Sequence, residues 1–158
     1  MRKQKGFSLI ELLIVVAIIL IIAAIAIPNL LRARIAANES SAVASIRTLN
    51  TGQISYYSAY PTVGFAGTLG ALAGTACAPP TSAGACLIDT QLASGSKSGY
   101  SFALSGVSGT PASTYQTIAT PLAVNQSGTR YFCSFEDAVV RASAATISTC
   151  DTASTPLQ

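Results

Sequence analysis

The chain has 158 residues, of which 50% are hydrophobic and 9% are charged, and its formal net charge is +3. Histidine and tryptophan are absent, which excludes Ser/His and Cys/His catalytic pairs and histidine-liganded metal sites. Arg2, Lys3 and Lys5 supply the whole net charge, so the charge gives no support for nucleic-acid binding. Because carboxylates are also few and scattered, we expect a protein that is not an enzyme and that uses no cofactor or metal.

The first predicted element is an apolar helix over residues 7–28 that is long enough to cross a bilayer. Residues 7–27 would span about 31 Å as a helix, close to the ~30 Å thickness of the hydrocarbon layer. Glu11 lies just inside this stretch, and residues 12–27 are all apolar. A charged side chain in the middle of a membrane helix costs roughly 2.5–3.5 kcal/mol, so Glu11 is a candidate functional residue. The basic residues before the helix predict a cytoplasmic N-terminus and an exported remainder.

Three kinds of N-terminal segment share these features. A secretory signal would be cut after the apolar run, at Ala24-Ile25-Ala26, whereas a signal anchor would stay uncut. A third kind of segment is a leader that is removed before the apolar helix. Glu11 weakens the first interpretation and is unexplained by the second. Ser8 and Glu11 also fit a capping box, which explains why the charge is tolerated at a helix start. The cap does not explain why the charge lies so far beyond a leader that ends at Gly6.

Residues 29–60 are expected to continue as an amphipathic helix. An apolar stripe of helical spacing predicts that the C-terminal sheet covers one face; its members are Leu31, Ile35, Ala42, Ile46 and Leu49. The charged residues lie mostly off this stripe: Arg32, Arg34, Glu39 and Arg47. Arg32 and Arg34 either face solvent or contact acidic groups of a neighbouring subunit. Pro28 removes an amide donor, and it marks either the exit from the membrane or a helix kink.

Residues 61–99 are rich in small residues and proline and are expected to form a partly irregular loop. From residue 100 the pattern alternates with a period of two, which predicts an antiparallel meander of three or four strands at 100–104, 115–119, 130–133 and 139–141. Turns are expected at 106–111 and 125–128. Glu136 and Asp137 are adjacent carboxylates that could bind calcium, but a solvated turn is the simpler interpretation.

The even number of cysteines, none in a CxxC pair, predicts disulfides formed in an oxidising compartment rather than a zinc site. Proximity favours Cys77–Cys86 and Cys133–Cys150 among the three possible pairings. Closing loops of this size stabilises a fold by about 3 kcal/mol each in the chain-entropy model. Buried reduced thiols are the alternative.

Residues 5–12, Lys-Gly-Phe-Ser-Leu-Ile-Glu-Leu, together with the following apolar run and Pro28, resemble the class III signal of type IV pilins and their pseudopilin relatives. This resemblance covers about residues 1–35. It implies that a prepilin peptidase removes a leader of residues 1–6 by cutting between Gly6 and Phe7, and that Phe7 becomes N-methylated. It also implies that Glu11 neutralises the terminal amine of Phe7 in a neighbouring subunit, and that Pro28 is a point where the helix bends in a filament.

The resemblance further implies an α+β pilin fold, in which a long N-terminal helix packs on a small antiparallel sheet within residues 100–158. The expected function is that of a structural subunit of a type IV pilus, held in the cytoplasmic membrane before assembly and part of a surface filament afterwards. The implied partners are other copies of the chain, the prepilin peptidase, an assembly platform and a motor ATPase. The alternatives are a pseudopilin of a type II secretion system and a monomeric membrane-anchored binding protein. A Cys133–Cys150 bridge resembles that of pilins, whereas Cys77 and Cys86 depart from their pattern.

Overall fold

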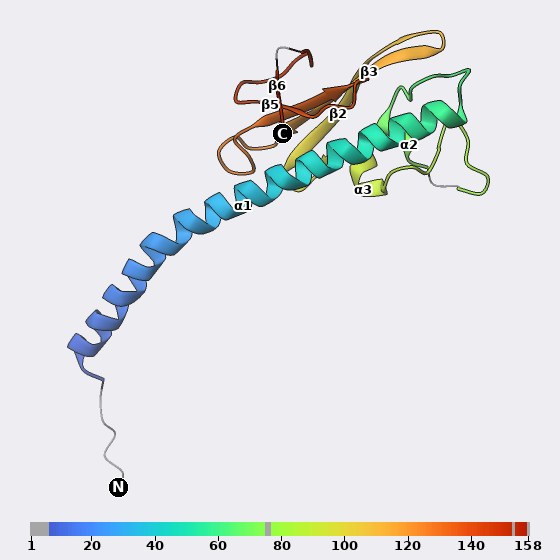
Figure 1. The fold of residues 1–158 in the computed structure, drawn as a ribbon. Helices are drawn as coiled ribbons and strands as arrows, with labels where there is room; N and C mark the ends of the chain where they lie inside the picture. The colour runs from blue at the N-terminus through green and yellow to red at the C-terminus, as the bar shows by residue number, and fades with distance from the viewer. Residues whose placement is uncertain (1–6, 75–76, 153, 158) are drawn as a thin grey trace. The chain divides into compact units, whose positions relative to one another are not determined.

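The computed structural model describes residues 7–74, 77–152 and 154–157, which form helices followed by strands (Figure 1). The helices are α1 (Leu9–Ala59), α2 (Leu69–Leu72) and α3 (Thr90–Ala93). The strands are β1 (Ser96–Lys97), β2 (Tyr100–Gly109), β3 (Ala112–Pro121), β4 (Tyr131–Phe135), β5 (Arg141–Ser143) and β6 (Thr155–Pro156). The chain divides into two compact units, which we call the N-terminal unit (Met1–Arg34) and the head unit (Ile35–Gln158). The architecture is α+β, as predicted.

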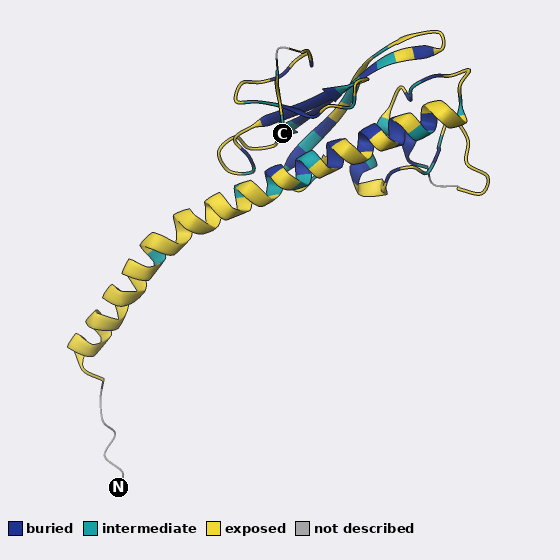
Figure 2. Ribbon diagram, viewed as in Figure 1, coloured by how far each residue is buried: buried dark blue, intermediate teal, exposed yellow. Residues whose placement is uncertain are grey.

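Helix α1 belongs to both units, and its burial differs between them (Figure 2). In the N-terminal unit its described side chains are exposed almost without exception. In the head unit one face is buried by the rest of the fold, at Ala42, Ile46, Leu49 and Tyr56. The predicted stripe is therefore confirmed from residue 42 onward, whereas Ile35 is half-buried and Leu31 is exposed.

The head unit contains a six-stranded antiparallel meander in which each strand pairs with the next along the chain. The expected count of three or four strands was too low, because β1 and β6 are too short to show an alternating pattern. The turn expected at 106–111 was also wrong, since β2 continues to Gly109. A register shift between Ser105 and Ser108, with Gly106 at a φ of +64°, lets this polar segment continue pairing with β3.

The segment after β4 also differs from the sequence-based expectation. The strand expected at 139–141 begins only at Arg141. The preceding residues form a turn in which Ala138 has a positive φ and the Asp137 carboxylate pairs with Arg141. Residues 61–99 contain α2, α3 and β1 as well as loop.

The core lies between α1 and the inner face of the sheet. Its largest strand side chains are Tyr100, Phe102 and Phe132, which cluster with the buried face of α1. A second cluster on the outer face includes Ile118, Tyr131 and Cys133 and is covered by the C-terminal segment around Ile147 and Cys150. Alternation along β3 and β4 thus places apolar side chains on both faces of the sheet.

Polar side chains of α1 fix the helix against the sheet and the following loop. The Asn50 amide nitrogen donates to the Ser134 hydroxyl at 2.9 Å, and the Tyr115 hydroxyl donates to the Asn50 amide oxygen at 3.2 Å. Gln53 forms a reciprocal pair with the Ala66 backbone, at 3.0 and 2.8 Å. Because these groups are buried, any other register between the helix and the sheet would leave them without partners.

Glu39 is buried in the head unit, contrary to the expectation that it lies off the apolar stripe. Its carboxylate accepts hydrogen bonds from the Thr129 amide at 2.9 Å, the Thr129 hydroxyl at 2.8 Å, the Arg130 amide at 3.2 Å and the Arg130 Nε at 2.8 Å. The Arg130 guanidinium also forms an ion pair with it at 2.8 Å. Next to it, the Asn38 amide nitrogen donates to the Ser127 carbonyl at 2.9 Å. We call this set of contacts the Glu39 clamp; it joins α1 to the loop before β4.

The clamp determines the ionisation of its carboxylate. Burial by itself raises the pKa of Glu39, but the hydrogen bonds from Thr129 and Arg130 and the Arg130 charge outweigh burial. The pKa is therefore held below its ordinary value of 4.5. A depressed pKa means that the ionised carboxylate stabilises the fold above the unfolded-state pKa, and that this contribution is lost as the pH falls through the folded-state pKa.

We expect Glu39→Gln to lower the free energy of unfolding by about 1–3 kcal/mol at neutral pH, because an amide weakens charge-assisted bonds and faces a donor at Arg130 Nε. Thermal unfolding of the full chain in detergent micelles, followed by circular dichroism, measures this loss. The difference from wild type should shrink as the pH falls through the lowered folded-state pKa of Glu39, because the wild-type carboxylate then takes up a proton. Glu136→Gln, which changes an exposed carboxylate, is the control and should leave the midpoint unchanged. A difference that stays constant over this pH range would contradict the assignment.

Candidate assembly segment

Helix α1 begins with a capping arrangement between Ser8 and Glu11. The Ser8 backbone N–H donates to the Glu11 carboxylate at 3.0 Å, and the Leu12 N–H donates to the Ser8 carbonyl at 3.2 Å. A glutamate three residues after the cap is the expected member of a capping box, and the positive end of the helix dipole favours its charge. The glutamate half of the predicted capping box is therefore confirmed. No cation among the described residues contacts Glu11, and the cap itself supplies hydrogen bonds but no positive charge.

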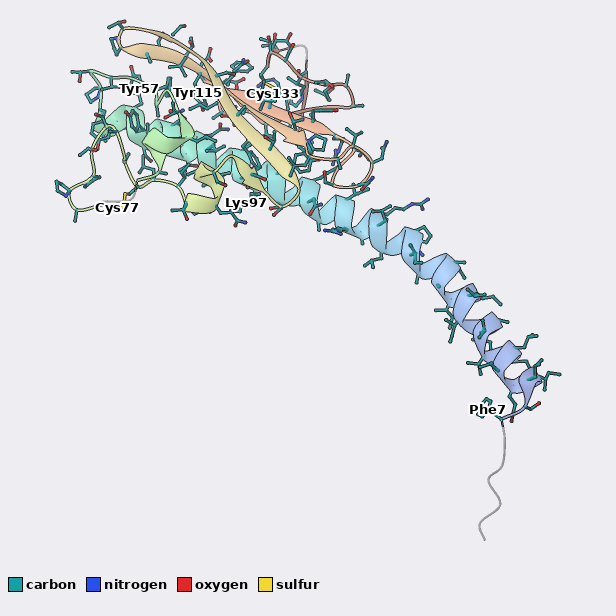
Figure 3. All side chains as sticks on the ribbon, turned by 180° about the vertical axis from the view of Figure 1, so that it is seen from behind. Phe7, Tyr57, Cys77, Lys97, Tyr115 and Cys133 are labelled. Atoms are coloured by element: carbon teal, nitrogen blue, oxygen red, sulfur yellow. A yellow bond between two sulfur atoms is a disulfide. The ribbon has the colours of Figure 1, made fainter. Side chains whose placement is uncertain are left out.

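The apolar residues that follow Glu11 are exposed around the whole helix. Phe7 is 79% exposed and Leu30 is 72% exposed, and the large aliphatic side chains between them are also exposed. Figure 3 shows Phe7 at the start of the described chain. The helix is long and apolar enough to cross a membrane, judged by length and composition. Because soluble monomers rarely expose large apolar patches, this surface requires a cover from outside the described chain.

Pro28 lies inside α1, which continues to Ala59. The ring nitrogen of Pro28 has no hydrogen, so the carbonyl four residues earlier loses its usual helical donor. Pro28 therefore does not end the helix, and its predicted kink stays a prediction. Gly6 and the rest of the expected leader lie outside the described residues.

Both disulfides favoured by proximity are present in the head unit. Cys77 pairs with Cys86 across 9 residues, and Cys133 pairs with Cys150 across 17 residues. Cys133 and Cys150 are buried and attach the C-terminal segment to β4, whereas Cys77 is exposed in the loop between α2 and α3. Figure 3 shows Cys77 and Cys133 in separate parts of the head.

The acidic pair Glu136 and Asp137 forms an exposed turn and not a metal cage. The Asp137 carboxylate binds the Arg141 guanidinium, and its hydrogen bonds to Arg141 hold the pKa of Asp137 below its ordinary range despite partial burial. Arg141 also stacks over Phe135, with 4.3 Å between the guanidinium carbon and the ring centroid. Within the described residues no group of three or more histidine, cysteine, aspartate or glutamate side chains could hold a metal.

Sequence reasoning missed the role of Glu39, although a signal was present. The apolar stripe has a gap of seven residues between Ile35 and Ala42, and Glu39 fills it at spacings of four and three. Grouping Glu39 with the charged residues that lie off the stripe ignored this helical position. A carboxylate on the buried face should instead have prompted a search for a cation, which Arg130 supplies.

Comparisons with known proteins find one family model and several relatives, and the family model matches the N-terminus. The family model is described as "Prokaryotic N-terminal methylation motif" and matches residues 1–27 of the chain. The chain is 48% identical over 56 residues to a type IV major pilin protein of Myxococcus xanthus, covering 35% of this chain and 26% of the relative. It is 68% identical over 40 residues to a type IV wide pilus major component of Thermus thermophilus, covering 25% of this chain and 30% of the relative.

A third relative belongs to a secretion system. The chain is 42% identical over 65 residues to the type II secretion system core protein G of Vibrio cholerae, covering 39% of this chain and 44% of the relative. The chain thus spans less than half the length of each of these curated relatives. No solved structure matches the chain. The chain bears the prokaryotic N-terminal methylation motif and is similar to type IV pilins, which confirms the resemblance of its first residues to them.

Proposed function

We propose that the chain is a structural subunit of a type IV pilus, made as a membrane-anchored precursor and polymerised through its N-terminal helix. The observation that carries this proposal is a methylation motif over residues 1–27 that includes the start of a helix whose apolar side chains are exposed on all sides. The matches to two major pilus components support it. Before assembly the cytoplasmic membrane covers the apolar helix, and in the surface filament other copies cover it.

Processing converts the precursor into a subunit that can assemble. A prepilin peptidase cuts between Gly6 and Phe7 and N-methylates the new terminus at Phe7. The leader carries Arg2, Lys3 and Lys5, so its removal takes away the basic residues that hold the N-terminus in the cytoplasm. It also creates an amine at the very end of an apolar helix.

Glu11 is the counterion for that amine in the filament. A cation at Phe7 and a carboxylate at Glu11 are each unfavourable in an apolar surrounding, and each offsets the cost of the other when they pair. The cap supports this role, because it holds the carboxylate at the helix start without neutralising it. Because only one axial stagger brings Glu11 to the Phe7 amine of a neighbour, the pair also sets the register between subunits.

The remaining proposed roles concern the packing of subunits in the filament and their movement out of the membrane. Pro28 is the point where the helix bends or locally unwinds as subunits pack into the filament. The apolar helices form the filament core, and the head units form its outer surface. An assembly platform and a motor ATPase move each subunit out of the membrane.

A second candidate function is that of a pseudopilin in a type II secretion system. The 42% identity to a type II secretion core protein favours it. This match covers 44% of that relative, against 26% and 30% for the two pilus components. Both candidates share the leader, the methylated terminus and the helical polymer. They differ in whether the polymer extends from the cell surface in wild-type cells, which electron microscopy of a deletion strain and its complement decides.

The processed terminus gives the most direct test of the proposal. Filaments sheared from cells should contain the chain beginning at an N-methylated Phe7, as measured by mass spectrometry of the intact subunit and its N-terminal peptide. A terminus at Met1 or Ile27 would contradict the proposed processing. Absence of filaments, with a monomer or small oligomer in detergent, would favour a membrane-anchored binding protein instead.

Substitutions at Glu11 separate its role in capping the helix from its role as the counterion of the Phe7 amine. Glu11→Gln keeps a residue that can complete a capping box but removes the charge, whereas Glu11→Leu removes both. We expect both variants to reduce sheared filament at least tenfold, while both precursors remain in the membrane and Glu136→Gln assembles normally. Quantitative immunoblots of sheared and membrane fractions measure this. Filament yields at the wild-type level for Glu11→Gln would show that the cap suffices and would overturn the pairing.

A further inference from the structure

The described cations fall into two groups. Those in the loops and strands of the head unit form ion pairs with carboxylates: Lys97 with Asp89, Arg130 with Glu39 and Arg141 with Asp137. Those on α1 are exposed and have no ion-pair partner among the described residues: Arg32, Arg34 and Arg47. The helix therefore carries guanidinium groups for which the described part of the chain supplies no counterion.

Arg32 and Arg34 directly follow Leu30 and Leu31, the last exposed aliphatic residues of the apolar segment. Two residues of helix correspond to a rotation of about 200° and a rise of about 3 Å. The two side chains therefore leave the helix on opposite sides at almost the same level, and residues at this spacing do not share a face. A partner that contacts one face of the helix meets only one of them, whereas a layer of anions around the helix meets both.

The level of this pair coincides with the headgroup layer of a bilayer. If residues 7–27 fill the hydrocarbon, the headgroup layer extends about 5–7 Å beyond Ile27 on the outward side. The Cα of Arg32 lies about 7.5 Å beyond Ile27 along the helix. Helical Cα–Cβ bonds tilt toward the N-terminus, and long arginine side chains reach toward the membrane interface. Both guanidinium groups therefore reach back into the layer of lipid phosphates.

We propose that Arg32 and Arg34 bind lipid phosphate groups of the outward-facing leaflet and fix the depth of the precursor in the membrane. A guanidinium matches the two oxygens of a phosphate in a bidentate geometry, and it stays charged at any physiological pH. The inference rests on the membrane-anchored precursor of the proposed function, but it does not depend on filament assembly. Leaving the bilayer breaks these contacts, so they oppose premature release of the subunit.

Magic-angle-spinning NMR tests the contact directly through the dipolar coupling between arginine ¹⁵N and lipid ³¹P. The full chain is labelled at arginine and reconstituted in vesicles of equal parts phosphatidylglycerol and phosphatidylcholine. Every sample carries Arg2→Gln, so that the leader supplies no guanidinium. We expect phosphorus-dependent dephasing of guanidinium nitrogens, and we expect Arg32→Gln/Arg34→Gln to abolish it. Arg47→Gln, about four helical turns farther along α1, should leave it unchanged.

Single substitutions test the geometry of the site. Because the two side chains lie on opposite sides of the helix, Arg32→Gln and Arg34→Gln should each remove about half of the dephasing. Arg32→Lys/Arg34→Lys keeps both positive charges but removes the labelled guanidinium groups, so it should also abolish the signal. No dephasing in the parent sample, or dephasing that survives the double substitution, would overturn the inference. Dephasing together with a failure of filament assembly would retain the inference and reject the proposed function.

Discussion

The central constraint in this chain is that α1 carries more apolar surface than the chain itself can cover. From residue 35 onward the helix buries one face against the sheet, with Ile46 and Leu49 fully enclosed. Before that point the side chains are apolar on every face, and nothing in the described chain packs on them. Hydrophobic burial is not directional, so a bilayer and a bundle of identical helices both meet this requirement. A chain built this way can pass between the two environments without refolding its head unit.

The head unit is held together by contacts that do not involve the N-terminal unit. The Glu39 clamp fixes the loop before β4 to α1, Asn50 fixes the helix to the sheet, and the Cys133–Cys150 bridge secures the C-terminal segment. Its stability is therefore supplied by contacts within the head unit. This separation of roles suits the proposed function, in which the helix exchanges lipid for protein neighbours.

The sequence predicted well those features whose signal is periodic or local. The long helix, the buried positions from Ala42 onward, the cap at Ser8 and the pairing of nearby cysteines all depend on residues close in sequence. The short strands β1 and β6 and the extension of β2 past Gly106 depend on pairing with distant segments, which a polar Ser/Gly pattern conceals. Glu39 was misplaced because its charge was weighed above its helical position, and its partners lie about ninety residues away in the sequence.

Glu11 and Glu39 show how one helix accommodates two carboxylates in different ways. Glu39 is buried within the head and receives backbone amides, a hydroxyl and a guanidinium from the same chain. Glu11 receives one backbone amide from its own cap, and no described cation approaches it. Since an ionised carboxylate in an apolar surrounding requires a cation, and the described residues supply one to Glu39 but none to Glu11, we propose that the counterion of Glu11 comes from another molecule. In the proposed filament, the Phe7 amine of a second copy meets that requirement once the leader is removed.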